Sequence, residues 1–378
     1  MQRHVAAKRP EKVARLGLLD GLRITAALAV VFYHYTAWGH SHWGTKAPDA
    51  WPILSEITRY GSIGVQLFFL ISGFVILMSV QGKSVLQFVA SRAGRLYPAY
   101  WLAVLAAAVL TFVLWPEASD GRTTGDILPN LTMMQTAMDV RDLDGVYWTL
   151  WAELRFYFLL GIMLALGWTK SHHIMLLSVL WPAVGLYFKF TGATTSMEWV
   201  LGQYSSLFCI GMLLYVIYTE GSSLTRWLLI GVNTLIASYH TGLKGAFDSS
   251  YLSGLDVPAW HFALLCTLCV AVVALCTVTP LNRVYSRWLV FAGSLTYPLY
   301  LIHELWGWWI IESLHLKINQ YVLLPLTIAI VLLVAYLISR FIEKPAGLLL
   351  RNGILAAGGK LGQRITLPVP SWARSDVP

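Results

Sequence analysis

The sequence predicts an all-α protein, a polytopic transmembrane bundle of about ten helices. Hydrophobic residues make up 57% of the 378 and charged residues only 12%, and the mean hydropathy is +0.62. A soluble domain usually carries about a quarter charged residues, so most of this surface faces something other than water. The apolar runs are continuous rather than alternating, which favours membrane-spanning helices over a membrane β-barrel. The lipid bilayer is therefore the first predicted partner.

Ten apolar runs are long enough to cross a bilayer, which takes roughly 20 helical residues. We place the spans at 19–38, 62–80, 98–115, 147–167, 174–190, 199–218, 225–241, 259–279, 288–311 and 321–342. The first run follows a basic arm, as in a secretory signal. It is longer than a signal's apolar region and no small-residue cleavage site follows it, so a retained helix is predicted. We expect a transmembrane domain over 1–346 and a mobile cytoplasmic tail over 347–378 with one short interfacial helix.

The distribution of Lys and Arg predicts the orientation, because cytoplasmic loops carry an excess of both. Most of the 27 lie in the N-terminal arm, in alternate loops and near the C-terminal end. Both termini are therefore predicted to be cytoplasmic, which requires an even number of crossings, and ten fits. The net charge of +8 follows from this bias and does not indicate nucleic-acid binding. The predicted location is the cell membrane, as a multi-pass protein.

The four cysteines all lie in predicted spans. Cys266 and Cys269 have the spacing of half a zinc site, but they lack a second pair and stand in an apolar helix. We interpret them as small packing residues and predict neither a structural disulfide nor a bound metal.

Two ionisable residues of the first span lie on one helix face. Arg23 and His34 are eleven positions apart, and eleven steps of about 100° come within about 20° of three full turns. The separation along the axis is roughly 16 Å, so the two could contact the ends of one elongated ligand. A charge inside the membrane is costly, and its default interpretation is functional. The alternatives are an Arg23 side chain that snorkels to the headgroups and a His34 in an interfacial aromatic belt.

Arg92 and Arg95 form a further charged cluster. They are three positions apart before the third span, so on a helix they form one cationic face suited to phosphate. Ordinary positive-inside anchoring is the alternative.

Glu153 lies in the fourth span, where a carboxylate needs a partner. Arg155 faces the opposite side of that helix, so the partner is expected on another helix, and His34, at a similar depth, is a candidate.

Two segments are less specific. Ser72 and Gly73 allow close helix approach. Pro298 frees a backbone carbonyl inside the ninth span, and His303 and Glu304 are expected near the outer face.

Six motifs in this order resemble acyltransferase family 3, over about residues 17–346. They are Arg23-x10-His34, the stretch from Phe68 to Phe74 that includes Ser72, Arg92-x-x-Arg95-Leu-Tyr97-Pro98, Trp148 to Glu153, Ser294 to His303, and Phe341 to Pro345. Each motif alone is weakly specific, but six in register make coincidence improbable.

The resemblance implies a membrane-embedded acyltransferase, in a family that mostly O-acetylates sugars of O-antigens, peptidoglycan, exopolysaccharides and macrolides. It implies acetyl-CoA or another acyl-CoA as donor, and a carbohydrate, glycolipid or glycosylated acceptor. It assigns a catalytic role to His34 and donor binding to Arg23, Arg92 and Arg95; we add Tyr97 and Ser72 of the same motifs. Some members carry an extra C-terminal esterase-like domain, and this chain, ending about 30 residues after its last span, is expected to have none.

The expected mechanism combines both lines of argument. The arginines hold the donor's phosphates at the cytoplasmic mouth, the pantetheine arm threads between helices, and His34 acts as general base on an acceptor hydroxyl. Glu153 is expected to orient the imidazole and stabilise the imidazolium. Direct transfer and an acyl-histidine intermediate both remain open.

The competing function is a transporter or flippase of an amphiphilic glycan without covalent chemistry. Intramembrane Arg, His and Glu would then bind substrate or relay protons, but the two similar halves typical of such transporters are not visible. The loop at 116–146 is rich in Asp and Glu, which favours a neutral sugar, a glycolipid or a glycosylated natural product as acceptor; acidic loops kept outside by topology alone are the alternative.

Overall fold

The computed structural model describes residues 16–365 and, from residue 359 on, only the backbone. Over this range the chain forms helices and turns and no strand, which confirms the predicted all-α bundle. The basic N-terminal arm and the last part of the predicted tail, 366–378, lie outside the described residues.

Each of the ten predicted spans overlaps a helix. These helices are α1 (Gly17–Thr36), α4 (Ile63–Val80), α5 (Val85–Val109), α7 (Trp148–Ala165), α8 (Ser171–Phe190), α10 (Ser205–Glu220), α11 (Leu224–Ser253), α12 (Ala259–Val278), α13 (Arg287–Leu314) and α14 (Gln320–Ile338). Predicted and observed boundaries differ by more than ten residues at α5 and α11. Seven helical segments, all except α10, α11 and α13, are long and apolar enough to cross a membrane. Shorter helices are α2 (Ala47–Ala50), α3 (Pro52–Thr58), α6 (Ile127–Leu131) and α9 (Thr194–Trp199).

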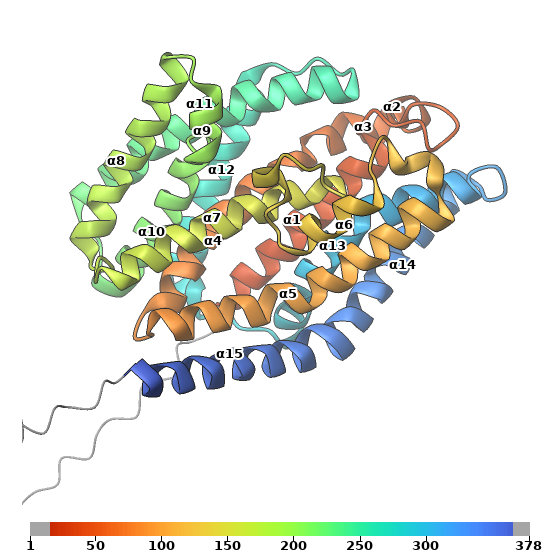
Figure 1. Cartoon of the computed structure of the whole chain (residues 1–378). Helices are drawn as coiled ribbons and strands as arrows, with labels where there is room; N and C mark the ends of the chain where they lie inside the picture. Colours follow the sequence, from red (N-terminus) through yellow and green to blue (C-terminus); the bar gives the residue numbers. More distant parts are fainter. Residues whose placement is uncertain (1–15, 366–378) are drawn as a thin grey trace, which may run out of the picture.

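Helix α1 lies in the middle of the bundle and packs against α4 and α13 (Figure 1). We call the end of the bundle where α1 begins the basic end, because Arg23, Arg95 and Lys344 gather there. The opposite end, where α2, α3 and α6 lie, is the loop end. His34 stands in the last turn of α1, toward the loop end.

Helices α4 and α10 cross with their backbones almost in contact. A Cβ added at Gly73 would lie 2.2 Å from the carbonyl oxygen of Phe208, and one at Gly211 would lie 2.1 Å from that of Leu70. Small residues at such crossings let membrane helices approach closely. The close approach predicted at Ser72 and Gly73 is confirmed.

The proline inside α13 has the predicted effect on its own helix. Pro298 has no N–H to donate to the carbonyl of Ser294. The hydroxyl of Ser339, which follows α14, donates to that carbonyl at 3.4 Å. A side chain of a neighbouring helical segment thus satisfies the freed group.

The segment predicted as a tail continues from α14 as helix α15 (Lys344–Ile365). It runs alongside α5 at the basic end (Figure 1). The two helices meet at Gly94 and Gly347, where a Cβ added to Gly347 would lie 2.3 Å from the carbonyl oxygen of Gly94. Helix α15 crosses the domain boundary expected after residue 346 without a break.

Candidate active site

The last turn of α1 places His34 against a second buried histidine, His303 of α13. Their rings are nearly parallel, with centroids 5.0 Å apart, and Nδ1 of His34 lies 3.0 Å from Nε2 of His303. The hydroxyl of Tyr35 donates to the carbonyl of His303 at 2.6 Å. The indole of Trp308 donates to the carbonyl of His34 at 3.0 Å. Bonds in both directions therefore hold α1 and α13 in register at this pair.

The hydrogen bonds of His303 assign the tautomer of both neutral rings. Nδ1 of His303 lies 2.9 Å from the carbonyl oxygen of Tyr300, and because a carbonyl only accepts, this nitrogen carries the proton. Nε2 of His303 is then an acceptor, so the facing Nδ1 of His34 donates to it. The second nitrogen of His34, Nε2, is left with its lone pair free for a substrate proton.

The carboxylate of Glu304 lies beside the His34–His303 pair. Oε2 of Glu304 lies 3.4 Å from Nδ1 of His34. The carboxyl group of Glu304 rests on the backbone of Gly145, where an added Cβ would lie 2.3 Å from Oε1. The neighbouring Asp144 accepts from the N–H of Leu305 at 3.4 Å and thereby ties the start of α7 to α13. Burial raises the pKa of the Asp144 carboxyl.

Glu153 is not the partner of His34, contrary to the sequence-based expectation. Its Oε1 accepts from the hydroxyl of Tyr157 at 2.5 Å and from that of Ser72 at 3.5 Å. Helix α7 packs on α4 and α5, whereas α13 lies directly against α1. Glu304 of α13 therefore stands where Glu153 was expected.

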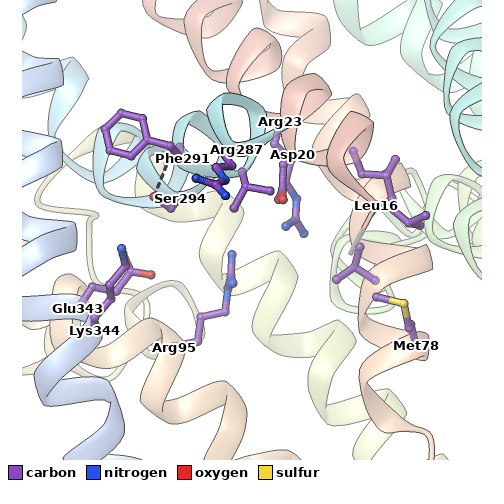
Figure 2. Close-up of a pocket in the computed structure, with 14 residues that line it drawn as sticks. Leu16, Asp20, Arg23, Met78, Arg95, Arg287, Phe291, Ser294, Glu343 and Lys344 are labelled. Atoms are coloured by element: carbon purple, nitrogen blue, oxygen red, sulfur yellow. Dashed lines mark hydrogen bonds between the residues drawn. The ribbon is translucent and has the colours of Figure 1, made fainter. Parts of the chain in front are cut away.

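A cavity of about 660 Å³ opens at the basic end; we call it the basic cavity (Figure 2). Four cationic side chains line it, Arg23, Arg95, Arg287 and Lys344, together with the carboxylates of Asp20 and Glu343. They come from α1, α5, α13 and the junction of α14 with α15, and Figure 2 shows them around one space. Cationic groups in excess of carboxylates suit an anionic, phosphate-bearing ligand.

A smaller cavity of about 130 Å³, the central cavity, follows the basic cavity toward the loop end. The two share Arg23, Arg95 and Val75 in their linings. Ser72, Arg92 and Glu153 also line the central cavity. The structure thus brings together five of the site residues predicted from the sequence: Arg23, Arg92, Arg95, Ser72 and Glu153. The guanidinium of Arg92 lies 5.8 Å from the ring centroid of Tyr157, and its buried Nε has no hydrogen-bond partner among the described residues.

A third cavity, of about 270 Å³, contains His34 and Glu304 in its lining; we call it the histidine cavity. It shares Val65 and Tyr300 with the central cavity. The hydroxyl of Thr149 donates to that of Tyr300 at 3.0 Å, which fixes the ring between the two spaces. The three cavities therefore adjoin in sequence from the basic end to His34.

Tyr97 does not line this series of three cavities. Its hydroxyl donates to the carbonyl of Thr132 at 3.0 Å, in the segment that covers the loop end. Tyr97 is absent from the linings of the three cavities. Its predicted place in the donor site is therefore unsupported by its position.

Sequence reasoning did not assign His303, Glu304, Arg287 or Lys344 to the site. His303 and Glu304 were noted only as lying near the outer face, since nothing in their spacing shows which helix they face. Arg287 and Lys344 were counted with the positive-inside residues. In the sequence, His303 and Lys344 belong to the last two family motifs, and Arg287 and Glu304 lie near the first of these two. The motifs gave none of the four residues a role.

The loop-end segment between α5 and α7 carries another perturbed carboxyl. Burial raises the pKa of Asp142 to about 6, although the hydrogen bond from Gln135 and the nearby charge of Arg122 lower it. The side-chain amide of Gln135 donates to Oδ1 of Asp142 at 2.5 Å, and Nε of Arg122 donates to its backbone carbonyl at 2.7 Å.

Comparison with known proteins adds a family match. A family model described as an acyltransferase domain matches residues 17–342. The acyltransferase MdmB of Streptomyces mycarofaciens is 34% identical over 157 residues, which cover 39% of this chain and 39% of that protein. Nodulation protein 10 of Rhizobium leguminosarum bv. viciae is 25% identical over 335 residues, 78% of this chain and 87% of that protein. The chain thus spans well under half of the first relative and most of the second. No solved structure matches the chain.

Proposed function

Because this chain belongs to acyltransferase family 3, we propose that it moves an acetyl or other short acyl group from acyl-CoA to a hydroxyl group. The acceptor is a carbohydrate or a glycosylated molecule. The proposal includes a multi-pass position in the cell membrane with both termini cytoplasmic, so that the basic end faces the cytoplasm, where acyl-CoA is made. The observation that carries it is the series of three adjoining cavities from four cationic side chains to His34.

The donor fits this series by its chemistry. Arg23, Arg95, Arg287 and Lys344 bind the phosphates of CoA in the basic cavity. The slender pantetheine arm passes Ser72 and Arg92 in the central cavity, and the thioester reaches the histidine cavity between Val65 and Tyr300. Glu153 shapes the central cavity and stands near the donor arm rather than near the base.

The chemical step needs one base and one stabilised cation. Nε2 of His34 takes the proton of the acceptor hydroxyl while its oxygen attacks the thioester carbonyl carbon. The C–S bond breaks, and the CoA thiolate leaves with the proton that the imidazolium returns. Glu304, at 3.4 Å from Nδ1, stabilises the imidazolium that forms in between.

Calorimetric binding of acetyl-CoA to the purified protein tests the donor site. We expect saturable binding that weakens by at least about tenfold in the Arg92→Ala/Arg95→Ala variant, because two charge-assisted contacts are lost. Arg340→Ala, which removes a cation outside the cavity linings, is the matched control and should bind normally. Absence of binding to the unaltered chain would rule out the proposed donor.

His34→Ala tests the base. Because a general base contributes about 10²–10⁴-fold, we expect CoA release in acetyl-CoA-supplied membranes from expressing cells to fall by at least about 10²-fold. Acetyl-CoA binding should remain, since the phosphates bind at the other end of the route. Normal turnover in this variant would exclude His34 as the base.

A further inference from the structure

One more cavity adjoins the histidine cavity, and a further cavity adjoins that one. The first, of about 710 Å³, is the loop-end chamber; it is lined by Trp151, Gln203 and Glu198 among others, and shares Trp148, Tyr204 and Lys244 with the histidine cavity. The second, of about 380 Å³, is the α7–α8 groove, which shares Arg155, Trp199 and Leu201 with the chamber. A second series of spaces therefore leads to His34.

The groove faces the lipid. Leu177, Leu180, Trp181 and Val184 of α8 line it, and their spacing puts them on one face of that helix. Leu180 is 53% exposed and Val184 42%, on a helix apolar enough to span a membrane. Its lining is apolar apart from Arg155, so the groove opens sideways into the hydrocarbon.

The chamber is sunk into the membrane. Helix α10 has 16 residues, about 24 Å of length, against a hydrocarbon layer of about 30 Å. The turn at 200–204 precedes it, and a Cβ added at Gly202 in this turn would lie 2.7 Å from the Cα of Gly185, well before α8 ends at Phe190. The turn therefore lies below the loop-end terminus of α8, where irregular backbone is tolerated if it lines a water-filled space. Leu201 in this turn has a φ of 54°, an unfavourable conformation for a branched side chain, and it lines both the chamber and the groove.

Arg155 stands where the groove meets the chamber. Its Nη1 donates to the carbonyls of Trp199, at 3.3 Å, and Glu198, and its guanidinium lies 5.0 Å from the ring centroid of Trp151. Within the described part of the chain no carboxylate forms an ion pair with it. The charge of Glu198 acts on this guanidinium from beyond ion-pair distance, and a cation with no carboxylate in direct contact can bind an anionic ligand group.

We propose that the acceptor is a membrane-borne amphiphile that reaches His34 sideways from the bilayer. Its apolar chain lies in the α7–α8 groove, an anionic junction such as a phosphate diester lies at Arg155, and its hydroxylated head group occupies the loop-end chamber and reaches into the histidine cavity. This inference rests on the proposed function and specifies the substrate class of the same site.

Photo-crosslinking in phosphatidylcholine nanodiscs tests the proposal with two probes that carry the same diazirine-bearing alkyl chain. One has a phosphoglycerol head group and the other a neutral glucoside. We expect the phosphoglycerol probe to label α7 and α8 at the groove, and unlabelled alkyl phosphoglycerol to compete. Val184→Trp, which fills the groove, should reduce this labelling several-fold. Val179→Trp is the matched control, because Val179 is 50% exposed on the opposite face of α8 and should leave labelling unchanged.

Arg155→Gln should remove the preference for the phosphoglycerol probe over the glucoside without changing the glucoside's labelling. Labelling spread evenly over the lipid-facing helices, or unaffected by Val184→Trp, would overturn the lateral route. An unchanged preference in Arg155→Gln would overturn the anionic junction. Acetyl-CoA binding is measured on the same preparations: normal binding with failed labelling refutes this inference alone, whereas absent binding refutes the proposed function whatever the labelling shows.

Discussion

His34 and His303 lie 269 positions apart in the sequence and 3.0 Å apart in the structure. The sequence predicted His34 from its alignment with Arg23, because a helical period relates residues of one helix. No such period relates residues of different helices, so the expected partner, Glu153, was chosen only by depth. The true neighbours, His303 and Glu304, depend on α13 packing against α1, which only the three-dimensional arrangement reveals.

Under the proposed function we expect His303 to act as a positioning residue, and two substitutions separate this role from simple packing. His303→Leu leaves Nδ1 of His34 without its imidazole acceptor, so the tautomer with a free Nε2 is no longer enforced. We expect turnover to fall by about 10²-fold, within the range of a general base's contribution, with KM for acetyl-CoA unchanged. In His303→Gln, the amide oxygen can accept from His34 and the amide nitrogen can donate to Tyr300, so part of the activity should return.

The direct readout is ¹⁵N NMR of the His34 ring, which reports the protonated nitrogen. A single Nδ1–H tautomer is expected in the unaltered chain and in His303→Gln, and a mixture in His303→Leu. Unimpaired turnover in His303→Leu would remove the positioning role.

At the scale of elements, composition and hydropathy predicted ten of the long helices because each span must be apolar over a fixed length. The short helices α2, α3, α6 and α9 carry no such signal, since four to seven residues are too few to show a period. Helix α15 was underestimated because glycines and charges interrupt its apolar residues. It forms alongside α5, where Gly94 and Gly347 allow contact.

The α4–α10 crossing is expected to be sensitive to a single added methyl group. In Gly73→Ala the new Cβ would lie 2.2 Å from the carbonyl oxygen of Phe208, and a backbone atom cannot rotate away. Overpacking of this kind typically costs about 1–3 kcal/mol, so the melting temperature in detergent should fall. Gly231→Ala in α11, where an added Cβ meets nothing within 4 Å, is the control, and its melting temperature should stay unchanged. Equal melting temperatures for the two variants would contradict the crossing.

At the scale of the whole molecule, the charge distribution predicts which end of the bundle is basic, and the structure gathers Arg23, Arg95, Arg287 and Lys344 around one cavity there. What the sequence does not contain is the volume between helices. Cavities depend on how the helices pack against one another. The basic, central and histidine cavities and the loop-end chamber therefore have no local sequence signal.

The stability of the whole fold should depend on pH through Asp142. Its pKa is raised from 3.8 to about 6 by burial, so folding favours the protonated carboxyl. The stabilisation is fully present below the unfolded pKa and is lost as pH rises through about 6. We expect the melting temperature to drop between pH 4 and pH 7 by more in the unaltered chain than in Asp142→Asn. Asp139→Asn, at an exposed position of the same segment, should retain the full drop, and identical profiles for all three would contradict the assignment.

Among the described residues, Val65 and Tyr300 alone are shared by the linings of the central and histidine cavities, and this junction has a kinetic consequence. In the proposed function, donor and acceptor approach it from opposite directions, so neither has to depart before the other binds. Direct transfer should then show random-order kinetics, with double-reciprocal lines that intersect. Parallel lines would instead indicate that His34 holds the acyl group after CoA has gone. Under the proposed function, spent CoA would return through the basic end to the compartment that reloads it, and the acylated product would leave on the other side of the junction.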